Sequence, residues 1–238
     1  MGQTNGIAVT FSRPTDFTRE AEWDEWYDDQ HLPDTVGESS GAWVVTRFET
    51  VERPPLFSAP VGFTHMTVHE FTDVDEQGPR FVERLRSLRS EGRIHPLHAV
   101  IGLDVFRAVG EWSAKPAPSD ALVGHVFAYT MANDLAREEE WNQWYDAVHV
   151  PDMMEADAFS ATTRWERLDR TEFGPNFWTL YDVELPDVSE AVARSGAVMP
   201  GIIERGRLSD LHAGGLRCAL EATGRYGGAG LLGTGVSG

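Results

Sequence analysis

The chain has 238 residues, of which 41% are hydrophobic and 11% aromatic, and this is enough apolar material to exclude extensive disorder. Its formal net charge of −18 argues against nucleic acid and against an anionic membrane surface, because both partners attract basic side chains. The single cysteine, Cys218, excludes an internal disulfide and a multi-thiolate metal site, and the single lysine, Lys115, lies in a proline-rich stretch that does not suit Schiff-base chemistry.

The N-terminal residues lack the pattern of a secretory signal, and no stretch approaches the roughly 20 apolar residues of a transmembrane helix. We therefore expect a cytoplasmic protein with no membrane partner.

In chain order, the hydrophobic pattern predicts a strand, a helix, two strands, a helix and a strand, and then the same series again. The first helix carries Trp23, Trp26, Tyr27 and His31 on one face, and Pro33 is expected to end it. The expected strands cover 7–11, 42–52, 62–71, 99–109, 122–130, 159–168, 177–185 and 213–222, and the later helices cover 77–90 and 187–205.

An internal repeat underlies this order. The segment from Arg19 to Asp28 recurs from Arg137 to Asp146, and His31, Pro33 and Asp34 recur as His149, Pro151 and Asp152 at the same offset of 118, since residue 137 matches residue 19. After a slip of one residue, Thr46-Arg47-Phe48-Glu49 matches Thr163-Arg164-Trp165-Glu166.

The repeat predicts two ferredoxin-like β-α-β-β-α-β units, at 1–112 and 122–226, with a linker at 113–121 and a disordered glycine-rich tail at 227–238. A four-stranded sheet with both helices on one face leaves its other face bare. We expect the two sheets to pack face to face, which gives an α+β fold.

The run Glu-Trp-x-x-Trp-Tyr-Asp-x-x-His-x-Pro-Asp, followed by a strand ending Thr-Arg-aromatic-Glu, resembles the dimeric α+β barrel superfamily and in particular its EthD-like branch. The resemblance covers about residues 7–109 and 122–222. It implies a barrel that most members build from two chains and that a tandem duplication could build within one. The superfamily is implied to include cofactor-free monooxygenases, cyclases, isomerases, decarboxylases and haem proteins, so the resemblance leaves the reaction open.

His31 and His149 are the leading catalytic candidates, because each ends the first helix of its unit on the face that carries the aromatic residues. An imidazole there could take and return a proton, although a structural histidine at a helix end is the competing interpretation. Tyr27 and Tyr145, one helical turn earlier, could hydrogen-bond a substrate oxygen.

Other residues are candidates for binding the substrate. Arg47 and Arg164 could bind a carboxylate or an enolate, or could form structural ion pairs instead. Asp34 and Asp152 could orient the imidazole of their unit and stabilise its charged form, but an aspartate after a proline is more often a turn or cap residue. The tryptophans are expected to be mainly core residues: Trp23, Trp26, Trp141 and Trp144.

The third strand differs between the halves. His65 and His69 share a face with Thr67, and we align these three positions with Thr179, Tyr181 and Val183. The two histidines are roughly 13 Å apart on an extended strand, too far to bind one metal together, but each could form a proton-transfer pair with His31. This favours the first half if only one half is active. His95 and His98 are expected on the surface.

The leading hypothesis is a cofactor-independent enzyme that uses His and Tyr in acid-base chemistry on a small apolar carbonyl, phenolic or polyketide-like compound. Cyclisation, isomerisation, dehydration or decarboxylation could follow proton removal. The alternatives are a cofactor-free monooxygenase, a non-catalytic small-molecule-binding protein, and a haem protein with His31, His65, His69 or His149 as axial ligand. No metal site is expected, and a homo-oligomer remains open.

Overall fold

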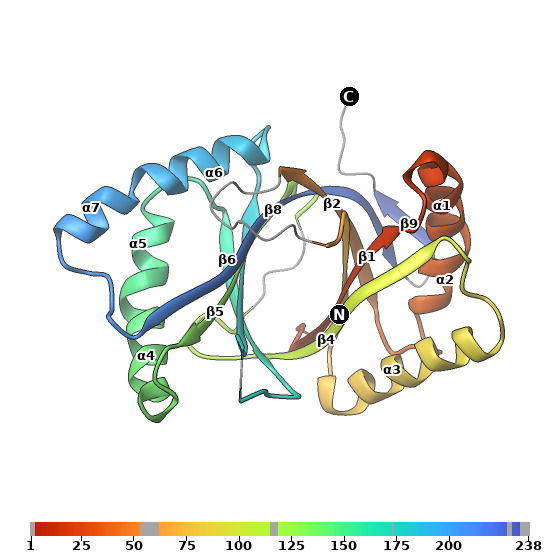
Figure 1. Ribbon diagram of the computed structural model, residues 1–238, viewed down its shortest axis with the longest axis horizontal. Coiled ribbons are helices and arrows are strands. Elements are labelled where there is room, and N and C mark those ends of the chain that lie inside the picture. The colour runs from red at the N-terminus through yellow and green to blue at the C-terminus, as the bar shows by residue number, and fades with distance from the viewer. Residues whose placement is uncertain (1–2, 53–61, 115–118, 173, 228–229, 234–238) are drawn as a thin grey trace. The chain divides into compact units, whose positions relative to one another are not determined.

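The computed structural model of the chain describes residues 3–52, 62–114, 119–172, 174–227 and 230–233. Its contacts divide the chain into two compact units (Figure 1). Unit 1 comprises Met1–Thr50, Val61–Arg107 and Ala222–Gly238, and unit 2 comprises Val51–Pro60 and Ala108–Glu221. None of the helices within the described residues has the length and apolar character needed to cross a membrane.

Unit 1 has the predicted β-α-β-β-α-β order. Its elements are β1 (Gly6–Pro14), a 3₁₀ turn (Phe17–Arg19), α1 (Glu20–Trp26), a π-turn (Tyr27–His31), α2 (Leu32–Thr35), β2 (Val44–Glu52), β3 (His65–Phe71), α3 (Val74–Ser90) and β4 (His98–Ala108). The strands are antiparallel in the order β2-β3-β1-β4, which is the ferredoxin-like topology.

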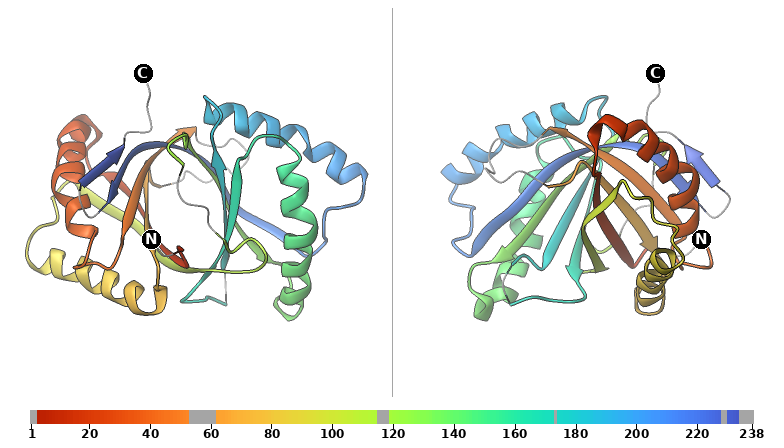
Figure 2. Two further views of the ribbon diagram at one scale, coloured as in Figure 1. Left: turned by 180° about the vertical axis from the view of Figure 1, so that it is seen from behind. Right: turned by 45° about the vertical axis from the view of Figure 1, so that its right-hand side comes forward.

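Both helical segments of unit 1 cover the same face of its sheet (Figure 2). Tyr27 hydrogen-bonds Thr67 of β3, and Phe81 of α3 packs against His69 of the same strand, two residues further on. Residues two apart on a strand point to one face. The layer between this face and the helices is therefore where the candidate residues of unit 1 lie.

The first helix does not end at Pro33, as the sequence analysis expected. It continues to Thr35 through a π-turn in which the Leu32 N–H bonds the carbonyl of Tyr27, five residues earlier. Pro33 has no N–H to offer, and its ring would crowd the carbonyl four residues before it in a regular α-helix. The wider π-turn removes that conflict, so the helix bulges at the proline and does not stop there.

Unit 2 repeats this order, with one difference in its second helical segment. Where α3 is continuous over 17 residues, the segment in unit 2 breaks at Val198 into two shorter helices. The elements are β5 (Gly124–Ala132), a 3₁₀ turn (Leu135–Arg137), α4 (Glu138–Trp144), a π-turn (Tyr145–His149), α5 (Val150–Met154), β6 (Ala161–Arg167), β7 (Phe177–Val183), α6 (Val188–Ala197), α7 (Met199–Glu204) and β8 (His212–Gly227). The strand order is β6-β7-β5-β8.

The glycine-rich tail is not wholly disordered, contrary to expectation. Residues 230–233 form β9 (Gly230–Gly233), which pairs with the end of β8 so that Tyr226 lies opposite Leu231. The rest of the predicted tail at 228–229 and 234–238 lies outside the described residues.

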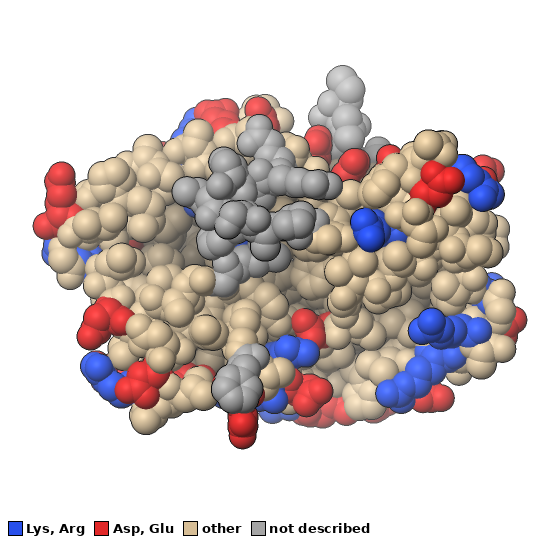
Figure 3. Space-filling model, in the orientation of Figure 1, with Lys and Arg blue, Asp and Glu red and all other residues tan. Residues whose placement is uncertain are grey.

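The charged side chains are distributed over the surface. On the face shown in Figure 3, acidic and basic residues are interspersed, and a basic group marks α3, which carries Arg80, Arg84, Arg86 and Arg89. Several of these arginines pair with carboxylates, for example Arg86 with Glu83. The large negative charge is thus partly matched locally, which is typical of a solvated surface.

Candidate active site

A π-turn places one tyrosine and one histidine against the sheet in each unit. In unit 2 the ring centroids of Tyr145 and His149 are 4.6 Å apart, and the ring of His212, the first residue of β8, lies 5.4 Å from that of His149. π-Turns occur frequently at functional sites. The turn here brings together two predicted candidates and one histidine that the sequence analysis did not single out.

These residues line a cavity of about 280 Å³ in unit 2. Its wall is largely apolar, and a few polar side chains converge on it, as is typical of small-molecule sites. The polar members include Tyr145, His149, Tyr181, His212 and Arg217, and the apolar wall includes Val126, Ala128, Met153, Phe159 and Met199.

The hydrogen bonds around Tyr145 leave its own proton available. The Thr179 hydroxyl donates to the Tyr145 oxygen over 3.1 Å. Because the tyrosine oxygen accepts this bond, its O–H remains free to donate to a ligand in the cavity. Tyr145 is fully buried, so such a bond would form away from competing water.

The two histidines of the cavity are held neutral. Burial, with a further contribution from His212, lowers the pKa of His149 to about 3. Burial also lowers the pKa of His212. The indole N–H of Trp141 lies 3.4 Å from Nδ1 of His212. This contact favours the tautomer of His212 that carries its proton on Nε2. A neutral imidazole of His149 is available as a proton acceptor at ordinary pH.

Arg217 and Tyr181, like His212, line this cavity without having been candidates in the sequence. Arg217 comes from β8 and Tyr181 from β7, on either side of β5. The signal was a single arginine in a strand whose next residues, Cys218 to Ala222, are largely apolar. A charged residue that alternates with buried Ala219 is a candidate for an inward-facing site, but the alternation alone does not distinguish the two faces.

In unit 1 the equivalent residues are packed against one another. His31 is 5% exposed, and the rings of Trp26, Tyr27 and His98 lie 4.9, 4.9 and 5.2 Å from its ring. Burial, followed by His98 and His69, holds the pKa of His31 well below its usual range. Tyr27 pairs with Thr67 as Tyr145 pairs with Thr179.

His98 is partly buried, whereas a surface position was expected. It begins β4, accepts a hydrogen bond from the indole of Trp23 on Nδ1 (3.2 Å), and its pKa is lowered to about 4, mainly by burial. His98 and His212 make the same contact with Trp23 and Trp141. A histidine at the start of the last strand in both halves was the repeat signal that could have identified this pair.

The alignment of the third strands needs correction by two residues. Because Tyr27 and Tyr145 bond Thr67 and Thr179, those threonines are equivalent, and His65 and His69 correspond to Phe177 and Tyr181. The offset of 118 does not extend to this strand because the preceding loops differ in length.

His65 and His69 make contacts of their own. His65 lies against Trp23 and bonds Thr64, and His69 packs on Phe81 with Nε2 3.1 Å from the Thr35 hydroxyl. Burial lowers the pKa of each to about 3. The rings in contact with His31 are those of Trp26, Tyr27 and His98, and a proton-transfer pair of His31 with His65 or His69 stays a prediction.

The predicted arginines and aspartates form ion pairs with protein groups. Arg164 pairs with Asp146 and Asn142, and Arg47 pairs with Asp24 and Asp28. Each guanidinium lies over the ring of its π-turn tyrosine, at 4.4 and 4.8 Å from the centroid. These arginines therefore brace the tyrosines from outside.

The two aspartates after the prolines bind cations, not imidazoles. Asp34 pairs with Arg93 (2.7 Å) and Arg84, and Asp152 pairs with Arg207 (2.7 Å). They tie the end of the first helical segment to the loop before the last strand. Asp152 also contributes a small upward effect on the pKa of His149, outweighed by burial.

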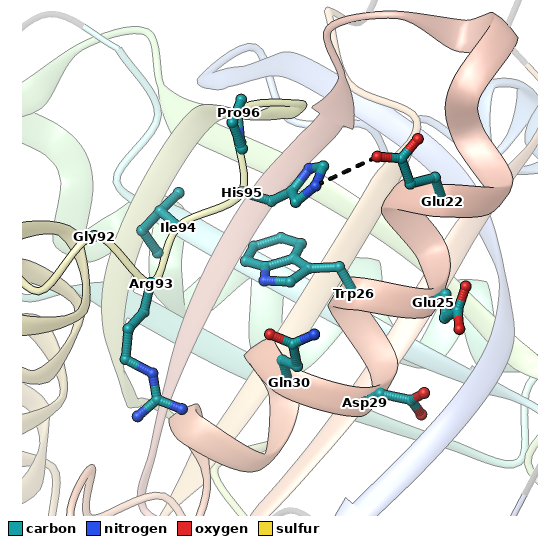
Figure 4. Close-up of a pocket in the computed structure, with 10 residues that line it drawn as sticks. All are labelled: Glu22, Glu25, Trp26, Asp29, Gln30, Gly92, Arg93, Ile94, His95 and Pro96. Atoms are coloured by element: carbon teal, nitrogen blue, oxygen red, sulfur yellow. Dashed lines mark ion pairs between the residues drawn. The ribbon is translucent and has the colours of Figure 1, made fainter.

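The predicted tryptophans divide into core and pocket edge. Trp23 and Trp141 have no exposed surface and belong to hydrophobic clusters. Trp26 borders an open hollow of about 510 Å³ on the outside of unit 1, together with acidic side chains and His95, which pairs with Glu22 at 3.6 Å (Figure 4). The other carboxylates drawn there point away from the indole, so this hollow lacks convergent acid-base groups.

The candidate haem ligands do not fit a haem in this structure. The cavity at His149 is at the lower edge of the roughly 300–1,000 Å³ that drug-sized ligands occupy, and a porphyrin is a large, flat group. The rings of Trp144, Tyr145 and His212 surround His149. His31 is similarly enclosed, and His65 and His69 already have hydroxyl partners.

No protein-family model and no curated protein matches this chain. Solved structures do match it in fold. A proposed monooxygenase from Fusobacterium nucleatum has 12% identity and a TM-score of 0.54 over 96% of this chain and 97% of its own. An anthrone oxidase-like protein has 12% identity and a TM-score of 0.54, covering 95% and 94%. A haem complex of Rhodococcus jostii DypB has 10% identity and a TM-score of 0.54, covering 93% and 94%. At these identities the likeness concerns the fold, and it confirms the expected class: the chain has the α+β fold of the dimeric α+β barrel proteins.

Proposed function

We propose that the chain is a cofactor-independent enzyme and that its acid-base site is the cavity of unit 2. The observation that carries the proposal is the convergence of a neutral imidazole, a tyrosine O–H and a partly buried guanidinium on one largely apolar space of about 280 Å³. Titratable groups whose pKa values are strongly shifted and that line a pocket are candidates for an active site.

In this proposal His149 removes a proton from carbon or oxygen of a small carbonyl or phenolic compound. The low pKa of the imidazole in the free cavity makes it a weak base there. A developing enolate changes this, because its negative charge stabilises the imidazolium at short range in a low-dielectric site. Tyr145 donates a hydrogen bond to the enolate oxygen, as an oxyanion-hole residue does.

The resulting anion could cyclise, isomerise, lose water or lose carbon dioxide, and the side chains described do not select among these outcomes. The repeated Tyr-Asp-x-x-His-x-Pro-Asp motif supports a place in the EthD-like branch, with the two units derived from a tandem duplication. The proposed substrate is a small molecule with one or two rings, as the cavity volume allows.

A cofactor-free monooxygenase is the second candidate. It would begin with the same proton removal, and the apolar wall formed by Met153, Phe159 and Met199 would admit dioxygen to the anion. The anthrone oxidase-like and proposed monooxygenase structures have the same fold and support this alternative only to that extent. Oxygen uptake that depends on His149 would distinguish it.

The test is proton abstraction itself, measured without knowing the natural substrate. We expect the protein to accelerate deuterium exchange into 2-tetralone, an apolar ketone with an activated C–H, as followed by NMR. His149→Ala should lower the protein-dependent rate by about 10²- to 10⁴-fold, the usual contribution of a positioned base. His31→Ala, the matched change in unit 1, should leave it unaltered. Equal losses in both variants, or none in His149→Ala, would contradict the proposal.

A further inference from the structure

Arg217 is a partly buried cation whose charge is not matched by a protein carboxylate among the described residues. It lines the cavity of unit 2, and its hydrogen-bond partner is the hydroxyl of Ser195, a fully buried residue of α6. Arg47 and Arg164, the arginines that lie over the π-turn tyrosines, both have aspartate partners. A guanidinium that is partly removed from water is stabilised when an anion lies near it.

Tyr181 provides a second unmatched group in the same space. Its side chain is 3% exposed, it lines the cavity, and its hydroxyl makes no hydrogen bond to the described residues. Buried hydroxyl groups nearly always have a partner, and for Tyr181 the Tyr145 hydroxyl beside it or a ligand in the cavity can supply one. Burial, with Tyr145 nearby, keeps the pKa of Tyr181 well above its usual range, so the hydroxyl is a donor.

The strand register explains how these two groups face one ligand. Tyr181 lies opposite Val126, and Arg217 lies opposite Ala128, two residues further along β5 and on the same face. Their backbones are separated by two strand spacings, roughly 10 Å. The small side chains of β5 between them leave the room that the cavity occupies.

We propose that this cavity takes its ligand as a monoanion, and that Arg217 and Tyr181 bind the anionic oxygen while the apolar wall holds the rest of the molecule. This inference rests on the proposed use of the cavity as a substrate site. It narrows the substrate class to a small organic acid with an apolar body, carrying a carboxylate, a phenolate or an enolate. Arg217 and Tyr181 would then set specificity for charge.

Unit 1 supports this division of roles because it lacks the pair. At the two equivalent positions it has Leu103, which lies opposite Thr10 in β1, and His69, which packs on Phe81. Leu103 packs against the hydrophobic cluster of that unit. The equivalent position in the last strand is therefore an apolar residue, Leu103, in unit 1 and a cation, Arg217, in unit 2.

The test compares charged and neutral probes of one shape on the full chain. We expect benzoate to bind at least tenfold more tightly than benzamide, and 4-nitrophenolate more tightly than nitrobenzene, in calorimetric titrations. Arg217→Leu introduces the residue that unit 1 has at this position. It should lower the affinity for benzoate by about 10- to 100-fold, because a charged hydrogen-bonded group is lost, and it should leave the affinity for benzamide unchanged. Tyr181→Phe should lower the affinity for benzoate less than Arg217→Leu does. The exposed Arg107→Leu is the control for net charge and should have no effect.

A thermal melt distinguishes ligand binding from a structural role. If the role of Arg217 is to bind a ligand, the ligand-free Arg217→Leu variant should have the same Tm as the unchanged protein or a higher one. A large fall in Tm together with unchanged benzoate affinity would overturn the proposal and make Arg217 structural. The two proposals fail separately. If Arg217→Leu has a much lower benzoate affinity while His149→Ala still catalyses deuterium exchange at the normal rate, the anion site is supported and the proposed reaction is wrong.

If Arg217→Leu has an unchanged benzoate affinity while His149→Ala no longer catalyses the exchange, only the anion inference is wrong. Tighter binding of nitrophenolate than of benzoate would identify a phenolate or enolate as the ligand type.

Discussion

The two units share a topology and a π-turn, but they use the space between sheet and helices differently. In unit 1, α3 is a continuous helix that packs Phe81 onto the sheet, and the ring centroids of Phe81 and His69 are 4.4 Å apart. In unit 2, the corresponding segment breaks between α6 and α7, and its buried residues facing the sheet include the small Ala191 and Ser195.

A unit can therefore keep the repeated tyrosine and histidine motif without having the cavity. Both units keep the tyrosine, the histidine and the histidine of the last strand, because these groups pack and hydrogen-bond among themselves. The described cavity that adds an arginine and a second tyrosine lies in unit 2. The geometry thus favours the second half for chemistry, whereas the extra histidines of the third strand favoured the first.

The largest expected difference between the units is their response to acid. The pKa values of His31, His65, His69 and His98 in unit 1, and of His149 and His212 in unit 2, are all lowered in the folded state. The unfolded chain therefore binds more protons below its ordinary histidine pKa of about 6.5, and stability falls as the pH drops from there toward about 3 to 4.

At pH 5.5, one unit below the unfolded value, each histidine whose folded pKa is about 3 to 4 costs the folded state about 1.4 kcal/mol. Unit 1 has more such histidines than unit 2, so it should lose several kcal/mol relative to pH 7.5 and unit 2 should lose less. Hydrogen exchange read by mass spectrometry at the two pH values should show opening of unit 1 first. Equal protection of both units at pH 5.5 would contradict the assigned burial of the four histidines.

Phe81→Ala tests the close packing of unit 1. Phe81 is fully buried, and its removal should lower the free energy of unfolding by about 3–5 kcal/mol. Phe159→Ala in unit 2 should cost less, since Phe159 borders the cavity and is 8% exposed. Urea titrations measure both values. The exposed Phe17→Ala is the control, and a larger loss for Phe159 would reverse the comparison.

Much of the fold could be predicted from the sequence, because hydrophobic periodicity and the repeat both report local pattern. The order of the elements and the inward faces of Tyr27 and Tyr145 follow from that pattern. The helix through Pro33 did not follow from it. A π-turn depends on a single hydrogen bond that closes five residues back, and the residue preferences that end helices at proline do not encode it.

The site was harder to predict because it depends on side chains that are far apart in the sequence. His212 and Arg217 come from the last strand, and neither belongs to the repeated motif that drew attention to His149. Register decides which face each one occupies, and a shift of two residues in the third strand misassigned His65 and His69. Pairing partners across strands, which the sequence does not list, were required to correct it.

Arg164→Ala should cost about 3 kcal/mol, because it leaves the carboxylate of Asp146, only 9% exposed, without its cation. Arg47→Ala should cost less. The carboxylates that Arg47 serves, on Asp24 and Asp28, keep side-chain exposures of 38% and 37%, so water can replace the guanidinium. Chemical denaturation of the two variants gives the comparison directly, and equal losses would show that exposure does not decide the value of these pairs.

The smallest expected effect is at the first turns of α3 and α6. Asp187 accepts the N–H of Ser189 at 2.7 Å, and Asp73 accepts the N–H of Glu76 at 3.3 Å. Replacing an N-cap aspartate by alanine typically costs about 0.5–2 kcal/mol, and the shorter bond should place Asp187→Ala toward the upper part of that range. The shorter helix also has fewer turns over which to recover the loss. Because Ser195 lies at the other end of α6, benzoate affinity should change less than twofold in Asp187→Ala, whereas a larger change would show that the position of the whole helix controls the Arg217 site.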